Sequence, residues 1–351
     1  MRQFTLVPAG RLWVYVRTEV LVLPSRLLVL LFAGGLLLLP LVYDDPYVLR
    51  VLVLTSIMAI YAASWDLLSS YSGQISFGHA MYFGVGAYVS ALTSYHLGWT
   101  PWLTIPIGSL GAAATGYLIG IPCLRLRGSY LSLATLAFPL IVLGVLFMVP
   151  DLSGGELGIS GLQPLVRSRV AYYYISVVSM LGLCAIMWQI GDSHTGLILH
   201  AIREDEVAAR ASGINTPRYK LLAFALSGLF AGFAGALYTH FLRIAGPSTL
   251  EVALSFQAVI WGIFGGVATI YGPVAGVFIL YPLTEALGMF AEISKYRLLL
   301  AAVVVLLVLL FMPEGVTPWI REKIEAECPR CKARSIATRR ACRICGAALR
   351  G

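Results

Sequence analysis

Apolar runs separated by short polar stretches dominate the chain. A helix needs roughly 20 such residues to cross a hydrocarbon core about 30 Å thick. The pattern predicts an all-α polytopic membrane protein with about ten transmembrane helices. The expected helices lie at 27–43, 48–69, 74–96, 102–121, 129–149, 170–190, 219–242, 252–271, 273–290 and 297–312.

Two joins between these runs are tight and contain Gly or Pro. One lies at Ser70 to Gly73 and the other at Tyr271 to Pro273. Each is either a simple turn or a broken or re-entrant helix, which is tolerated in a membrane only where the backbone is buried in protein or lines water. The number of spans can therefore shift by two.

The longest polar interruption in the second half of the chain is HTGLILHAIREDEVAARASGINTPRYK, at 194–220. It predicts a short helix outside the bilayer, in which Arg203, Glu206 and Arg210 share one face and Glu206 precedes Arg210 by four residues in the favourable order. Gly213 stands where a left-handed C-terminal cap is expected. Such a helix suits a soluble partner, but the residues alone fit a solvated loop helix equally well.

The composition agrees with a membrane protein. Of the 351 residues, 59% are hydrophobic and 12% charged, and the mean hydropathy is +0.84. The net charge of +8 does not point to nucleic acid, because nineteen of the 25 Lys and Arg residues fall on one side if both termini are inside, as the positive-inside rule requires. We expect a multi-pass protein of the plasma (inner) membrane, in contact with lipid, with cytoplasmic N- and C-termini.

Four of the six cysteines form two C-x-x-C pairs separated by ten residues near the C-terminus. This is a zinc spacing, in which each pair supplies half of a tetrahedral thiolate site. A redox-active thiol pair is the alternative. The expected ligands of a structural Zn²⁺ are Cys328, Cys331, Cys342 and Cys345.

The chain therefore divides into a polar N-terminal segment, a membrane domain, a linker helix and a small zinc-ribbon-like module. The metal must hold this module together, since about 25 residues are too few for a hydrophobic core. The expected boundaries are 1–26, 27–312 with a cytoplasmic loop at 192–220, 313–327 and 328–351.

Polar side chains occur inside the predicted spans. Gln74, Ser76 and His79 begin the third span, and such groups tend to face the bundle interior or a water path. Asp66 and Glu285 lie near span ends, where they are expected to reach water. No chain of carboxylates crosses the midplane, which argues against proton coupling. The sequence also lacks a P-loop and any grouped nucleophile and base, so neither nucleotide binding nor an enzyme is expected.

Several stretches together resemble a known family. They are GQISFGHAMYFGVGAY at 73–88, LRLRGSYLSLATLAF at 124–138, GGELGISG at 154–161, AIREDEVAARASGINTPRYKLLAFALSGLFAGFAGALY at 201–238 and PEG at 313–315. In this order they resemble the permease subunits of branched-chain amino acid ABC importers, in particular the LivM-like branch. The similarity covers about 45–316, and the N-terminal segment and cysteine tail depart from it.

The resemblance implies an importer with a second, LivH-like permease, two cytoplasmic ABC ATPase subunits and an extracytoplasmic solute-binding protein. The segment 201–213 then seats in the ATPase, and Gln74, Ser76 and His79 border the path. Branched-chain amino acids are the expected cargo, with urea, short amides and aromatic acids as alternatives. The residues expected to carry the ATPase contact are Arg203, Glu204, Asp205, Glu206 and Arg210, with Gly213 ending the helix.

Two other classes of function remain open on the sequence. The bundle can be a passive channel for a small solute, with 201–213 as a bystander. Alternatively the cysteine tail is the main device of a membrane-tethered sensor or scaffold, although ten spans are far more than an anchor needs.

Overall fold

The computed structural model describes residues 24–43, 45–126, 128–289 and 295–328, and in the tail 331, 334–336 and 345. The chain forms two compact units. The larger is Asp44–Val316, and the smaller combines Met1–Tyr43 with Thr317–Gly351.

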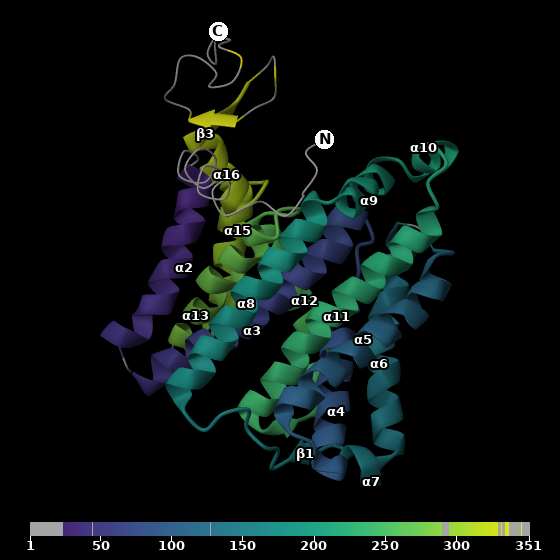
Figure 1. Cartoon of the computed structure of the whole chain (residues 1–351), viewed down its shortest axis with the longest axis vertical. Helices are drawn as coiled ribbons and strands as arrows, with labels where there is room; N and C mark the ends of the chain where they lie inside the picture. Colours follow the sequence, from purple (N-terminus) through teal and green to yellow (C-terminus); the bar gives the residue numbers. More distant parts are fainter. Residues whose placement is uncertain are drawn as a thin grey trace, which may run out of the picture. The chain divides into compact units, whose positions relative to one another are not determined.

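The larger unit is a bundle of α-helices (Figure 1). Each of the ten predicted runs contains one helix, counting α2 of the smaller unit, so the predicted fold class is confirmed. The long helices are α2 (Pro24–Val42), α3 (Pro46–Asp66), α4 (Ala80–Leu97), α5 (Pro101–Cys123), α6 (Ser129–Met148), α8 (Arg169–Asp192), α11 (Thr216–Leu242), α12 (Val252–Gly265), α13 (Tyr271–Met289) and α15 (Arg297–Phe311).

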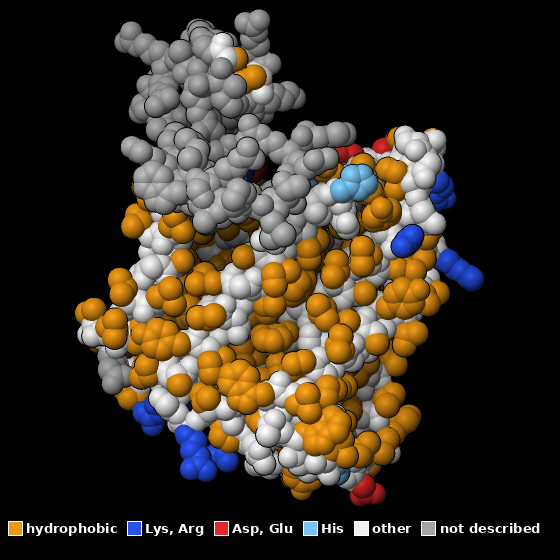
Figure 2. Space-filling model, in the orientation of Figure 1, with side chains coloured by type: hydrophobic (Ala, Val, Ile, Leu, Met, Phe, Trp, Pro, Cys, Tyr) orange, Lys and Arg blue, Asp and Glu red, His pale blue; other side chains and the backbone are white. Residues whose placement is uncertain are grey.

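Within the described residues, seven helical stretches are long and apolar enough to cross a membrane. The part of α2 from Leu27 to Val42 and the whole of α12 are shorter apolar helices. Hydrophobic side chains cover the middle of the face shown in Figure 2, and the charged side chains of the larger unit lie near its two ends. This distribution matches a body immersed in hydrocarbon with its ends in water.

The centre of the bundle is α11 packed against α4 and α5, and small residues set the distance between these helices. A Cβ added at Gly235 would collide with the backbone carbonyl of Phe83 in α4, and one at Gly228 would meet the carbonyl of Ala112 in α5 at 2.6 Å. These glycines therefore allow the helix backbones to pack closely.

The first tight join leads into an interruption inside the bundle, whereas the second, Tyr271 to Pro273, is the first turn of α13 and directly follows another interruption. After α3 the chain forms a π-helix, η2 (Leu67–Tyr71), and then non-helical backbone over 73–79 before α4 begins. The expected start of this span at 74 is therefore wrong. Side-chain hydroxyl groups accept the hydrogen bonds of backbone amides that have no helical partner here. Ser69 accepts from Ser76 N, Thr135 from Phe77 N and Ser255 from Ala80 N. We call 73–79 the first break.

The second break is 266–270, between α12 and α13. Its backbone has positive φ at Gly266, Ala268 and Ile270. Asp66, at the end of α3, accepts hydrogen bonds from three amides of this loop and is fully buried. The expectation that Asp66 reaches water is therefore wrong, because the loop supplies the partners that water would otherwise provide.

Short elements lie at the two ends of the larger unit. At one end, β1 (Ile159–Ser160) pairs antiparallel with β2 (Ile244–Ala245), close to α7 (Pro150–Ser153) and η3 (Pro247–Leu250). At the other end lie α9 (His194–Glu204) and α10 (Glu206–Ala211), which connect α8 to α11 (Figure 1).

The described part of the smaller unit contains α2, most of α16 (Val316–Ile324) and a hairpin of β3 (Glu325–Glu327) and β4 (Arg334–Ile336). Within α16, Lys323 Nζ lies 3.7 Å from the centre of the Trp319 ring. The segment expected to be a linker helix at 313–327 is thus helical over 316–324 and continues into a strand.

Candidate coupling site and cysteine cluster

The polar segment 194–220 is not one helix. Asp205 has extended backbone and separates α9 from α10, and its Oδ1 accepts from Val207 N at 2.8 Å and Ala208 N at 3.0 Å. Arg203 and Glu206 therefore do not share a continuous helical face, and that expectation is wrong. An aspartate at this position is a preferred N-cap, so the sequence carried a signal for the break. Gly213 has φ +84°, as expected for a left-handed cap.

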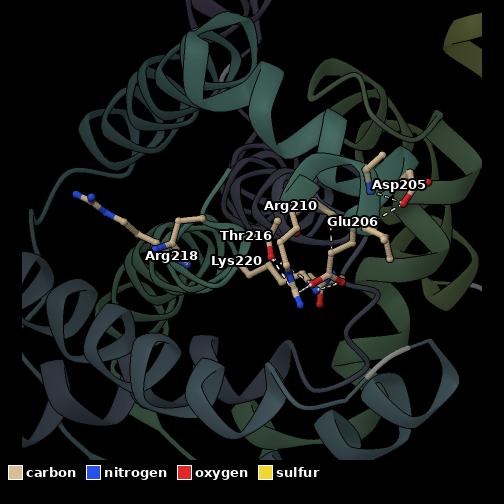
Figure 3. Close-up of polar contacts among 11 residues, drawn as sticks. Asp205, Glu206, Arg210, Thr216, Arg218 and Lys220 are labelled. Atoms are coloured by element: carbon tan, nitrogen blue, oxygen red, sulfur yellow. Dashed lines mark hydrogen bonds and ion pairs between the residues drawn. The ribbon is translucent and has the colours of Figure 1, made fainter. Parts of the chain in front are cut away.

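Glu206 is the centre of a charged cluster (Figure 3). Its Oε2 lies 2.7 Å from Lys220 Nζ, and its Oε1 lies 2.9 Å from an Arg210 guanidinium nitrogen. Thr216 donates to Oε1 at 3.4 Å. The Lys220 side chain is only 4% exposed, against 21% for Glu206 and 55% for Arg210. The cluster therefore fastens α10 to the start of α11, and Arg218 points away from it (Figure 3).

Arg203 connects α9 to the region where the bundle is interrupted. One of its guanidinium nitrogens donates to the backbone carbonyl of Ser70, in η2, at 2.8 Å. Gly73, at φ +70°, lies so close that a Cβ there would approach the Arg203 backbone to 3.2 Å. The α9–α10 segment is thus in direct contact with the start of the first break.

A cavity of about 260 Å³ opens at this contact. It brings Gln74, which was expected to border the transport path, together with Arg203 and Glu206, which were expected to contact the ATPase. Gln74 is buried and donates to the Ser72 carbonyl at 3.3 Å. The lining residues are Ser72, Gly73, Gln74, Leu126, Gly128, Leu131, Ile202, Arg203, Glu206 and Lys220.

Ser76 and His79 do not line this cavity. Both are buried within the first break, where the Ser76 carbonyl accepts from the Trp65 indole and His79 Nε2 lies 2.9 Å from Ser64 Oγ. Since Ser64 donates to the Tyr61 carbonyl at 2.6 Å, the proton of the His79 bond belongs to Nε2. These two residues therefore hold the shape of the break.

Other side chains of the α9–α10 segment face outward. Glu204, Asp205 and Val207 are exposed, and the apolar Val207 is 67% exposed. His200 packs against Tyr71 with ring centres 4.7 Å apart. Burial lowers the pKa of His200 below its ordinary value, and the charge of Arg203 lowers it further. His200 is therefore neutral at pH 7, and the exposed surface here combines the acidic Glu204 and Asp205 with Arg210 and the apolar Val207.

The described cysteines of the tail converge. The sulfur atoms of Cys328, Cys331 and Cys345 all lie within 4.8 Å of one another, and Cys328 Sγ is 3.5 Å from Cys345 Sγ. Cys328 follows β3, so the hairpin of β3 and β4 presents it. Cys342, the fourth expected ligand, lies outside the described residues. Three converging thiols fit a tetrahedral metal site, and this site can hold a metal ion.

Comparison with known proteins identifies the membrane domain. The family model described as "branched-chain amino acid transport system / permease component" matches residues 47–311. The chain belongs to this family. It is accordingly a multi-pass membrane permease component, and the matched range excludes α2 and the cysteine tail.

Curated members of this permease family and related permeases are similar along most of the chain. The high-affinity branched-chain amino acid transport system permease protein LivM of Escherichia coli K12 is 28% identical over 78% of this chain and 70% of its own length. Its LivH counterpart from Salmonella typhimurium is 26% identical over 75% and 92%. The ribose import permease RbsC of Haemophilus influenzae is 25% identical over 75% and 84%. No solved structure matches.

Proposed function

We propose that this permease is one of two membrane subunits of an ATP-driven importer for branched-chain amino acids. The proposal rests on the similarity to LivM, which exceeds that to sugar permeases. The partners are a LivH-like permease, two cytoplasmic ABC ATPase subunits and an extracytoplasmic solute-binding protein. ATP is hydrolysed by the ATPase subunits, and this chain binds no nucleotide.

Both termini and the α9–α10 segment face the cytoplasm in this proposal. The positive-inside distribution supports this orientation, since the Arg and Lys residues of 192–220 then lie inside. The β1–β2 end faces the binding protein.

The α9–α10 segment is the surface on which the ATPase acts. The observation that carries this role is the bond between Arg203 and the Ser70 carbonyl, because it joins the segment to η2 and the first break. Glu206 keeps α10 on α11 through Lys220, so the segment moves as one piece with the start of α11. The outward Glu204, Asp205 and Val207 supply the ATPase contact, and Arg210 borders it.

The coupling role is tested with Arg203→Met in the complete complex reconstituted in vesicles. Methionine keeps the apolar stem and removes the donor to Ser70. We expect ATP hydrolysis to continue while leucine uptake per ATP falls by about tenfold to a hundredfold, the effect of losing one charge-assisted bond of roughly 1.5–3 kcal/mol. Arg218→Met is the matched control, because Arg218 points away from the cluster (Figure 3).

Equal uptake per ATP in the two variants contradicts the coupling role. Uptake without ATPase subunits identifies a passive channel instead. The cargo is identified by competition for leucine uptake. We expect valine and isoleucine to compete strongly. Strong competition by urea, acetamide, phenylalanine or ribose in their place contradicts the assignment of branched-chain amino acids.

The cysteine tail binds one structural Zn²⁺ in this proposal. The convergence of Cys328, Cys331 and Cys345 supports it, and Cys342 completes the ligand set by its spacing. Zinc has no redox chemistry in such a site and stabilises the fold of the module. Transport does not depend on the tail, since the family match ends at residue 311.

A further inference from the structure

The C-terminal end of α3 carries three consecutive polar side chains, all of them buried. Ser64, Trp65 and Asp66 each bind a segment outside α3. Buried polar groups in a membrane-spanning helix are costly unless partners satisfy them, and they concentrate where they serve a function. The identity of their partners therefore shows what this end of α3 does.

Asp66 binds the second break. Its Oδ1 accepts from Ala268 N at 2.8 Å, and its Oδ2 accepts from Thr269 N and Ile270 N at 3.1 Å each. Ala268 and Ile270 have φ of 58° and 55°, a conformation that is unfavourable for residues with a side chain. One carboxylate thus holds three amides in a conformation that the loop does not favour by itself.

Ser64 and Trp65 bind the first break. The Trp65 indole donates to the Ser76 carbonyl at 2.9 Å, and Ser64 Oγ lies 2.9 Å from His79 Nε2. The Trp65 ring also faces α12 just before the second break, since a Cβ added at Gly262 would lie 2.6 Å from the ring. The same three residues therefore reach both interruptions of the bundle.

We propose that Asp66 is a positioning residue that joins the two breaks into one rigid body, so that both move together when the transporter changes state. This rests on the proposed function, which supplies the two states. Discontinuous helices form the substrate and ion sites of many transporters, which move largely as rigid bodies, and two breaks that moved independently would change the shape of such a site. The Ser64–Asp66 end of α3 keeps their separation fixed.

The separation can be measured directly in the complete complex. Spin labels carried by unnatural amino acids at Ile75 and Val267, two exposed positions in the two breaks, leave the native cysteines untouched. We expect the same distance between the labels in the ATP-free complex and in the vanadate-trapped complex. A change of about 5 Å, the size of a one-turn shift, overturns the proposal.

Asp66→Asn tests whether the carboxylate is responsible. Asparagine keeps one oxygen acceptor but turns an NH₂ group toward amides that can only donate. We expect the distance distribution between the labels to broaden and leucine uptake per ATP to fall at least about tenfold, with ATP hydrolysis retained. Asp45→Asn is the matched control: Asp45 caps the other end of α3 by accepting from Tyr47 N and Val48 N, and Asn caps equally well.

Trp65→Phe provides a second variant if Asp66→Asn does not assemble. It removes only the indole donor to the Ser76 carbonyl and should broaden the same distribution. An unchanged distribution in the variant that assembles overturns the proposal. If the unaltered complex shows no ATP-driven uptake, the proposed function is wrong. If it shows uptake but the distance between labels 75 and 267 changes with state, only the rigid connection between the two breaks is wrong.

Discussion

The bond between Glu206 and Lys220 should contribute much more to stability than the bond between Glu206 and Arg210. The first joins a side chain that is 4% exposed to one that is 21% exposed, at 2.7 Å. The second has a similar length, 2.9 Å, but its arginine is 55% exposed. Distance does not separate the two bonds, so solvent access decides between them.

The expected magnitudes follow from these exposures. Exposed pairs at i, i+4 on a helix contribute about 0.3–0.5 kcal/mol, and this value applies to Arg210. Removing one partner of a fully buried pair costs roughly 3–5 kcal/mol. Glu206 is partly exposed and keeps Thr216 as a donor, so we expect a coupling free energy with Lys220 of about 2 kcal/mol, between these limits.

Double-mutant cycles measure both couplings. One cycle combines Glu206→Gln with Lys220→Met, and the other combines Glu206→Gln with Arg210→Met. The free energy of unfolding is obtained for the purified chain by denaturant titration in mixed micelles, and the coupling is the departure from additivity. A coupling with Lys220 that is no larger than that with Arg210 refutes the reasoning.

Two further predictions concern packing and metal. Gly235→Ala should lower the free energy of unfolding by about 1–3 kcal/mol, because its Cβ meets the Phe83 carbonyl of α4. Gly182→Ala in α8, where a Cβ has nothing within 4 Å, should be neutral or stabilising by up to about 1 kcal/mol. Equal effects of the two substitutions would contradict the packing argument. The intact chain should carry about one zinc by native mass spectrometry. Cys331→Ser should lose this zinc and Cys184→Ser should keep it, and a metal-free intact chain rules the site out.

The hydropathy pattern was sufficient to predict the helices of the bundle. Runs of about 20 apolar residues have one low-cost arrangement in a bilayer, a helix, because hydrocarbon offers no partner to an open backbone. The two tight joins also indicated possible breaks, although the second break lies just before its join, at 266–270. The sequence did not show whether each join is a simple turn or a broken helix. The hydroxyl groups of Thr135 and Ser255, which accept hydrogen bonds from the amides of the first break, lie far from it in the sequence.

The candidate site was predicted in part. Asp205 as a helix cap and Glu206 with Arg210 as an i, i+4 pair are local relations, and both are readable from spacing. Lys220 lies fourteen residues from Glu206, across the turn between α10 and α11, so no helical period connects them. The partners of Asp66 are about two hundred residues away, and a carboxyl near the end of an apolar run gives no sign of them.

The long-range contacts of Arg203 and Asp66 meet at η2, and this connects the α9–α10 segment to the second break. Arg203 binds the carbonyl of Ser70 in η2, and Asp66, which immediately precedes η2, binds the second break. A π-helix is rare and occurs frequently at functional sites. Under the proposed function, a displacement of α9 by the ATPase therefore reaches η2 first and passes through Asp66 to residues 268–270. The first break lies on the same chain segment, so both breaks receive the movement through η2 without any contact of their own with the ATPase.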